Sequence, residues 1–169
     1  MAKLLSEDQE YRSYIEIAAG PMLESSNGNA DEVWQYCTLT LANGQRQLVY
    51  TAKHPSTYEL EQSAFADYAK VASGYLLCRK PKDEVKGLVD QLSHIVDGKS
   101  SHAIFEPLEP SFELTVLFEG SENVRVTIFV DEGNVETAVC RWDALGLRFF
   151  TTRNNLLTFI NELKQEFAC

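Results

Sequence analysis

Apolar and polar side chains alternate along most of this chain, and the alternation predicts strands. Four segments alternate in succession in the second half, and short turns that contain Gly or Asp separate them. A period of two residues puts apolar side chains on one face of a strand, and strands joined by short turns pair antiparallel. We therefore expect an antiparallel meander, in the order residues 112–118, 124–130, 135–142 and 145–151.

The first half of the chain shows the same alternation together with a hairpin signal. Residues 11–18, 33–41 and 47–51 are predicted strands. Asn43-Gly44 lies between the last two strands, and both residues tolerate the positive φ angles of a tight turn. The segment 20–31 is rich in turn residues and is predicted to be a loop.

Apolar residues at helical spacing predict three helices. They cover residues 56–73, with Gly74 as the stop, residues 83–96, and a last segment from a cap at Thr152 or Asn154 to about Phe167. The predicted buried stripe of the last helix consists of Leu156, Phe159, Ile160, Leu163 and Phe167.

Both halves of the chain therefore contain strands followed by a helix. This order predicts an α+β fold, in which antiparallel β-sheets carry helices packed on one face. A chain of 169 residues, 44% of them hydrophobic, can bury one substantial core, so we expect a single domain over residues 1–169. Residues 11–97 and 104–167 share the same order of elements, which makes a pseudo-duplicated arrangement an alternative description.

The formal charge of −10 narrows the range of partners. Phosphate binding needs clustered Lys and Arg, so the composition argues against a nucleic-acid binder and against docking on an anionic membrane. A basic partner suits this chain better. The first residues lack the pattern of a signal peptide, and no apolar run reaches the roughly 20 residues that cross a bilayer. We expect a cytoplasmic protein.

The sequence contains few signals of catalysis or cofactor binding. It has no G-x-S-x-G, no phosphate-binding glycine motif and no pair of histidines at metal-ligand spacing among His54, His94 and His102. Cys37 and Cys140 fall on predicted strands, where a thiolate lacks the helix N-terminus or base that would activate it. We therefore predict no catalytic residue, cofactor or metal site.

The strongest candidate for a functional feature is a set of glutamates in residues 104–123, a segment without Lys or Arg. The set consists of Glu106, Glu109, Glu113, Glu119 and Glu122. Pro107 and Pro110 bias the residues before them toward extended geometry. The glutamates fit three interpretations: the solvated rim of a strand, an acidic binding surface, or a carboxylate acid/base pair. Because Glu113 lies out of phase with the apolar residues around it, we expect its side chain to face solvent.

Several short motifs resemble one known family. They are F-E-P-L-E-P-S-F-E-L from Phe105, a strand that ends in V-D-E-G-N, the segment G-L-R-F-F-T-T, and a terminal helix with L-x-x-F-x-x-E-L-x-x-E-F. Together they are similar to the WapI-type family of bacterial immunity proteins, best over residues 104–167. The similarity extends loosely to W-Q-Y-C-T-L-T-L, L-V-Y-T-A and E-L-x-x-x-x-F-A-x-Y in the first half. Glu106-Pro107 and Glu109-Pro110 are the part of the glutamate set that matches the motif.

The resemblance implies a small cytoplasmic protein without enzymatic activity, which binds and neutralises the C-terminal domain of a polymorphic toxin, often a nuclease. An acidic surface would cover a basic nuclease site well, and the five glutamates are our candidate for that surface. Trp34, Tyr36 and Trp142 are candidate aromatic anchors. Two alternatives stay open: an interaction or structural module with another partner, including a homodimer through an edge strand, and a small hydrolase that uses Glu106 or Glu109.

Overall fold

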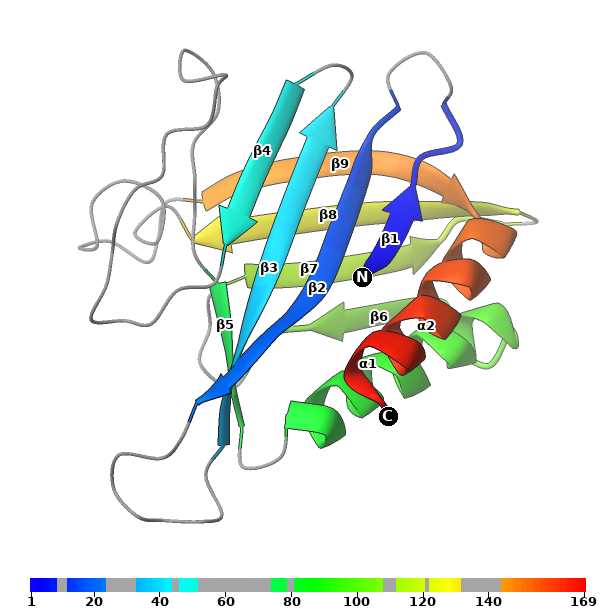
Figure 1. Ribbon diagram of the computed structural model, residues 1–169. Coiled ribbons are helices and arrows are strands. Elements are labelled where there is room, and N and C mark those ends of the chain that lie inside the picture. The colour runs from blue at the N-terminus through cyan, green and yellow to red at the C-terminus, as the bar shows by residue number, and fades with distance from the viewer. Residues whose placement is uncertain are drawn as a thin grey trace.

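The computed structural model describes residues 1–8, 12–23, 33–43, 46–51, 74–78, 81–107, 112–120, 122–131 and 144–169. These residues form two antiparallel sheets and two helices, as Figure 1 shows. The N-terminal sheet contains β1 (Ala2–Leu5), β2 (Tyr14–Leu23), β3 (Val33–Asn43), β4 (Arg46–Thr51) and β5 (Gly74–Cys78). The C-terminal sheet contains β6 (His102–Phe105), β7 (Phe112–Phe118), β8 (Asn123–Asp131) and β9 (Ala144–Thr152). The helices are α1 (Pro81–Val96) and α2 (Arg153–Phe167).

Strand pairing differs between the two sheets. The C-terminal sheet has the simple order β6-β7-β8-β9. In the N-terminal sheet the order is β1-β2-β3-β4, and β5 also pairs with β3. Because β2 occupies one edge of β3, β4 and β5 divide the other edge, with β4 on residues 38–43 and β5 on residues 33–37.

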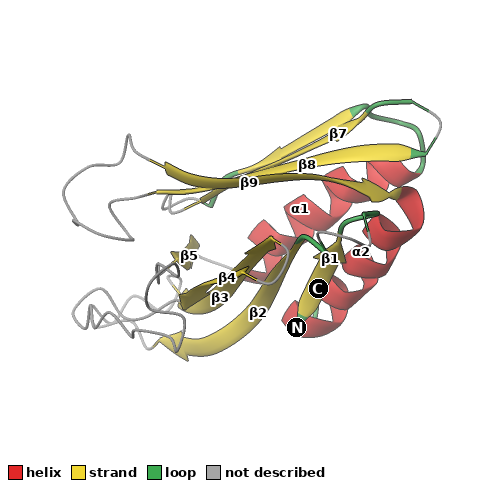
Figure 2. Cartoon of the chain, turned by 90° about the horizontal axis from the view of Figure 1, so that it is seen from above, coloured by secondary structure: helices red, strands yellow, loops and turns green. Residues whose placement is uncertain are grey.

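The two sheets form separate layers, and both helices lie along one side of them (Figure 2). Helix α1 packs against β6 and α2 packs against β1, so each helix lies beside the edge strand of a different sheet. The helices also pack against each other. This arrangement turns one face of each sheet toward a shared interior.

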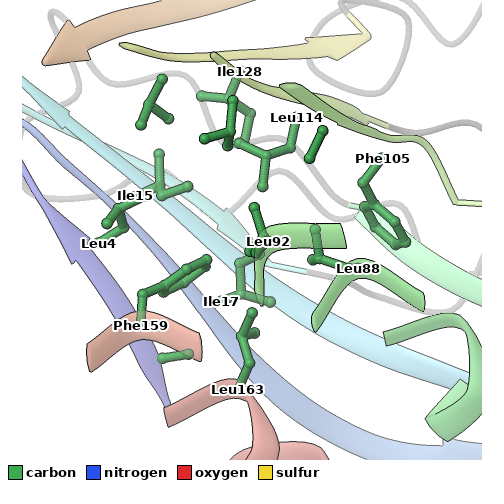
Figure 3. Packing of buried hydrophobic residues seen from close by; sticks show 14 of the residues in the cluster. Leu4, Ile15, Ile17, Leu88, Leu92, Phe105, Leu114, Ile128, Phe159 and Leu163 are labelled. Carbon is green, nitrogen blue, oxygen red and sulfur yellow. The ribbon is translucent and has the colours of Figure 1, made fainter. Parts of the chain in front are cut away.

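One hydrophobic core joins the sheets and helices (Figure 3). Each fully buried Leu or Phe side chain contributes about 1.5–3 kcal/mol relative to exposure in water. The interior residues labelled in Figure 3 are Leu4, Ile15 and Ile17 from the N-terminal sheet, Phe105, Leu114 and Ile128 from the C-terminal sheet, Leu88 and Leu92 from α1, and Phe159 and Leu163 from α2.

Side chains from the helices also provide acceptors for backbone amides at the edges of the sheets. The N–H of Lys3 in β1 donates to Oε2 of Glu162 on α2 at 2.7 Å. The N–H of Ala19, in β2 beyond the end of β1, donates to Oε1 of Glu166 at 2.9 Å. A hydrogen bond from the Met1 amino group is the main cause that lowers the pKa of Glu166. In the other sheet, the N–H of Ile104 donates to Oε1 of Gln91 on α1 at 3.3 Å.

The α+β class is confirmed, with antiparallel sheets and the order of strands followed by a helix. The hairpin of β3 and β4 and the strand over residues 112–118 have the predicted positions. Helix α2 begins after Thr152, whose hydroxyl accepts from the N–H of Asn155 at 3.1 Å. Its buried residues are the five that the helical spacing predicts.

Four details of the sequence prediction are wrong. Residues 20–23 continue β2 and are not a loop, because a register shift between Ala19 and Met22 accommodates Gly-Pro within the strand. Strand β5, which begins at Gly74 and pairs with β3, was not expected. The short strand β6 was not expected. Strand β8 pairs directly with β9, so the meander order differs from the predicted one. The predicted helix 56–73 and strand 135–142 lie outside the described residues.

The contact between α2 and β1 gives a first prediction. Glu162→Ala removes the acceptor for the part-buried N–H of Lys3, and we expect the free energy of unfolding to fall by about 1–3 kcal/mol. Glu162→Gln keeps an acceptor oxygen and should retain most of that stability. Urea denaturation of both variants and the parent chain measures the difference. Equal losses in the two variants would show that the negative charge of Glu162, and not its acceptor oxygen, stabilises this edge.

Candidate partner-binding face

The C-terminal sheet has a second face, which points away from the helices and the other sheet (Figure 2). Alternation along each strand assigns side chains to one face or the other. In β7, Phe112, Leu114 and Val116 are buried in the core, whereas Glu113 is exposed. We call the side that carries Glu113 the outer face.

The register of the strands arranges the outer face in three rows that cross the sheet. The first row contains His102, Leu117, Arg125 and Phe150. The second row contains Ile104, Thr115, Thr127 and Arg148. The third row contains Glu113, Phe129 and Gly146. Residues far apart in the sequence are therefore neighbours on one surface.

Three large apolar side chains on this face are exposed to solvent. Ile104 is 55% exposed, Phe150 47% and Phe129 41%. Single exposed apolar residues are common on protein surfaces, but here three of them share one face of a sheet together with Arg148. The outer face is thus the candidate site for a partner within the described part of the chain.

Phe129 has a defined position on this face because its cross-strand partner is a glycine. A Cβ atom at Gly146 would lie 2.5 Å from Cε1 and 2.6 Å from Cδ1 of the Phe129 ring. A side chain at position 146 would displace the ring, so the ring occupies the space over β9 that Gly146 leaves open. The glycine thus determines where the ring of Phe129 rests.

Polar side chains on and beside the outer face are held by short contacts. Nη1 of Arg125 lies 3.0 Å from Oε1 of Glu119, which compensates the charge of this arginine. Nε of Arg148 donates to the Thr127 hydroxyl at 3.3 Å. At the other end of β7, the Thr115 hydroxyl donates to Oε1 of Glu113 at 3.0 Å. Arg148 therefore presents its charge in the middle row.

The structure places the candidate glutamates at two ends of the C-terminal sheet. Glu106 is exposed just after β6, and Glu113 is exposed near the start of β7. Glu119 and Glu122 are exposed at the connection between β7 and β8. At about 3.3 Å per residue, the two ends of β7 are roughly 20 Å apart. Glu109 lies outside the described residues.

This geometry suits binding better than acid/base chemistry. A general acid needs an apolar pocket that raises its pKa, whereas Glu106 and Glu113 are exposed. Among the residues that the structure describes, no group of three His, Cys, Asp or Glu side chains is placed to hold a metal ion. No helix in this part of the chain combines the length and the apolar character of a membrane span.

The aromatic residues on the outer face are not those that the sequence analysis selected. The side chains of Trp34, Tyr36 and Trp142 lie outside the described parts of the chain. Phe129 and Phe150 were missed, although each had a signal. Both lie out of phase with buried neighbours, Phe129 between Ile128 and Val130 and Phe150 between Phe149 and Thr151.

His94 and His102 are exposed, and His54 lies outside the described residues.

A comparison with family models gives the relationship of this chain to known proteins. The model described as the Immunity protein WapI-like family matches residues 79–168, more than half of the chain. The chain belongs to this family. No curated protein matches it.

The segment that matches the WapI-like family corresponds to complete elements of the fold. It contains α1, the whole C-terminal sheet and α2, and therefore every residue of the outer face. It confirms the resemblance seen over residues 104–167 and adds helix α1. The strands β1–β5 of the N-terminal sheet lie outside the matched residues.

The contact of Phe129 with Gly146 can be tested without a partner. An aromatic ring shifts the NMR signals of protons close to it, so the α protons of Gly146 should resonate away from the position of an ordinary strand glycine. Phe129→Leu should abolish this shift. Phe150→Leu, which removes the other exposed ring, should leave the shift in place. An unchanged Gly146 signal in Phe129→Leu would contradict the position of the ring.

Proposed function

We propose that this chain is an immunity protein that binds the toxin domain of a cognate polymorphic toxin and neutralises it without an enzymatic reaction. The observation that carries the proposal is the match to the immunity family over residues 79–168. The exposed apolar side chains within this segment support a role in binding. We assign the activity to one domain, because both sheets and both helices contribute to one core. We also propose a cytoplasmic location, as the sequence composition indicates.

We also propose that the toxin domain is basic and that the glutamates help to attract it. The chain carries a formal charge of −10, and Glu106, Glu113, Glu119 and Glu122 are exposed at the two ends of the C-terminal sheet. Opposite charges speed association and favour the correct partner. A nuclease fits this description, because its substrate-binding surface must attract phosphate. Glu109 belongs to the proposed acidic set on the basis of its sequence position.

Calorimetric titration tests this function with purified components. The probe is a catalytically inactive form of the C-terminal domain of the toxin encoded beside the gene for this chain. We expect binding that weakens as salt is added. Glu106→Lys and Glu113→Lys should each weaken it roughly three- to tenfold at low salt, because they replace an attraction at the interface rim with repulsion.

Asp90→Lys is the matched control for these variants. Asp90 is exposed on α1 and pairs with Lys86, so its replacement makes the same change in net charge away from the outer face. We expect it to have a smaller effect than Glu106→Lys or Glu113→Lys. Equal effects of all three would indicate general attraction without a local acidic surface. A wild-type chain that does not bind the toxin domain would refute the proposed function.

A further inference from the structure

We infer that the toxin domain docks on the outer face of the C-terminal sheet, with Ile104, Phe129 and Phe150 at the centre of the contact and the glutamates at its ends. This inference rests on the proposed function and adds the binding surface and the chemistry that the partner must present. We call Ile104, Phe129, Phe150 and the cation Arg148 the platform.

The composition of the platform matches the centre of a protein–protein interface. Aromatic residues and Arg are enriched at such centres, and acidic and lysine side chains are depleted there. Phe129 and Phe150 flank Arg148 in neighbouring rows of the sheet. The face is four strands wide, and at about 4.8 Å between strands it can supply the apolar centre of an interface, which typically covers about 800 Å² on each partner.

The platform is also organised before a partner arrives. Gly146 leaves the space in which the Phe129 ring lies, and the Thr127 hydroxyl accepts a hydrogen bond from Arg148. Side chains whose positions are already restricted lose less conformational entropy on binding. Phe129 therefore supplies apolar area at a low entropic cost.

The charges around the platform define the chemistry of the partner. Glu106 and Glu113 lie at one end of the sheet, and Glu119 and Glu122 lie at the other. The two groups are separated by the length of β7, roughly 20 Å. A complementary surface has an apolar centre, Lys or Arg at two positions that match these ends, and a carboxylate or carbonyl oxygen opposite Arg148. A basic toxin domain satisfies this pattern.

A second copy of this chain fits the outer face less well. Each copy carries a formal charge of −10, and face-to-face packing would bring acidic ends of both copies to one interface. Like charges at an interface oppose association. The charge distribution therefore favours a basic protein over a homodimer as the occupant.

The test uses the full chain and the inactive toxin domain described above. We expect Phe129→Ala, Phe150→Ala and Arg148→Ala each to raise the Kd at least about tenfold. The losses for the two phenylalanine variants should persist at high salt, because they remove apolar area and no charge. Leu157→Ala is the matched control, since Leu157 is 44% exposed on α2, outside the platform, and it should bind like the wild type.

A measurement on the wild-type chain accompanies the variants, so that a folding defect cannot imitate a binding defect. Adding the toxin domain should move the Gly146 α-proton signals, because the ring of Phe129 lies close to Gly146. Circular dichroism and thermal unfolding show whether each variant is folded. Gly146→Ala provides a further variant, since it displaces the ring while it keeps Phe129, and it should also weaken binding.

Each remaining outcome overturns the inference in a different way. Platform variants that bind like the wild type, with an unmoved Gly146 signal, would refute the docking surface and leave the immunity function intact. A wild-type chain that fails to bind the toxin domain would refute both. A homodimer that Phe129→Ala and Phe150→Ala convert to monomers would assign the outer face to a second copy of the chain.

Discussion

The edges of the two sheets impose the constraint on which the rest of this structure depends. An edge strand has backbone amides without a strand partner, and such amides need another acceptor when they are partly buried. In β1 the part-buried amide of Lys3 donates to Glu162 of α2, and in β6 the amide of Ile104, which is exposed, donates to Gln91 of α1. Each helix is therefore fixed beside one edge. Because the helices also pack on each other, they connect two sheets that come from different parts of the chain.

The position of the helices determines which surface stays available. With both helices and the N-terminal sheet on one side of the C-terminal sheet, only its inner face enters the core (Figure 2). Successive side chains of a strand point to opposite faces of the sheet, so burying one set in the core places the other set on the outer face. In β8 the burial of Val126, Ile128 and Val130 requires Phe129 to be exposed. The outer face is thus a direct consequence of how the core is closed.

Periodicity predicts the parts of this fold that follow from local patterns. Helix α2 is an example, because one capping residue and one apolar stripe determine its start and its buried side. Strand β6 was missed because four residues before a proline show too little alternation to be distinguished from a loop. The direct pairing of β8 with β9 depends on contacts between residues distant in sequence, which no local pattern contains. The same limit applies to the site. The glutamates are recognisable in the sequence as one group, but only the register separates them into two ends and places Phe129 between Glu113 and Gly146 in one row.

The carboxylates and the apolar side chains of the outer face contribute to binding in different ways. Exposed carboxylates at the ends of a surface are well solvated, so they contribute little to affinity and mainly influence how fast a partner of opposite charge arrives. Apolar side chains have the opposite property, because their contribution appears only after water has left the contact. On this face Phe129 lies in the same row as Glu113, and Phe150 lies two rows away, toward the end that carries Glu119 and Glu122. A partner attracted to both ends would therefore be aligned across the aromatic residues before contact. For the toxin binding that we propose, this order would combine fast association through the carboxylates with slow dissociation through the apolar contact.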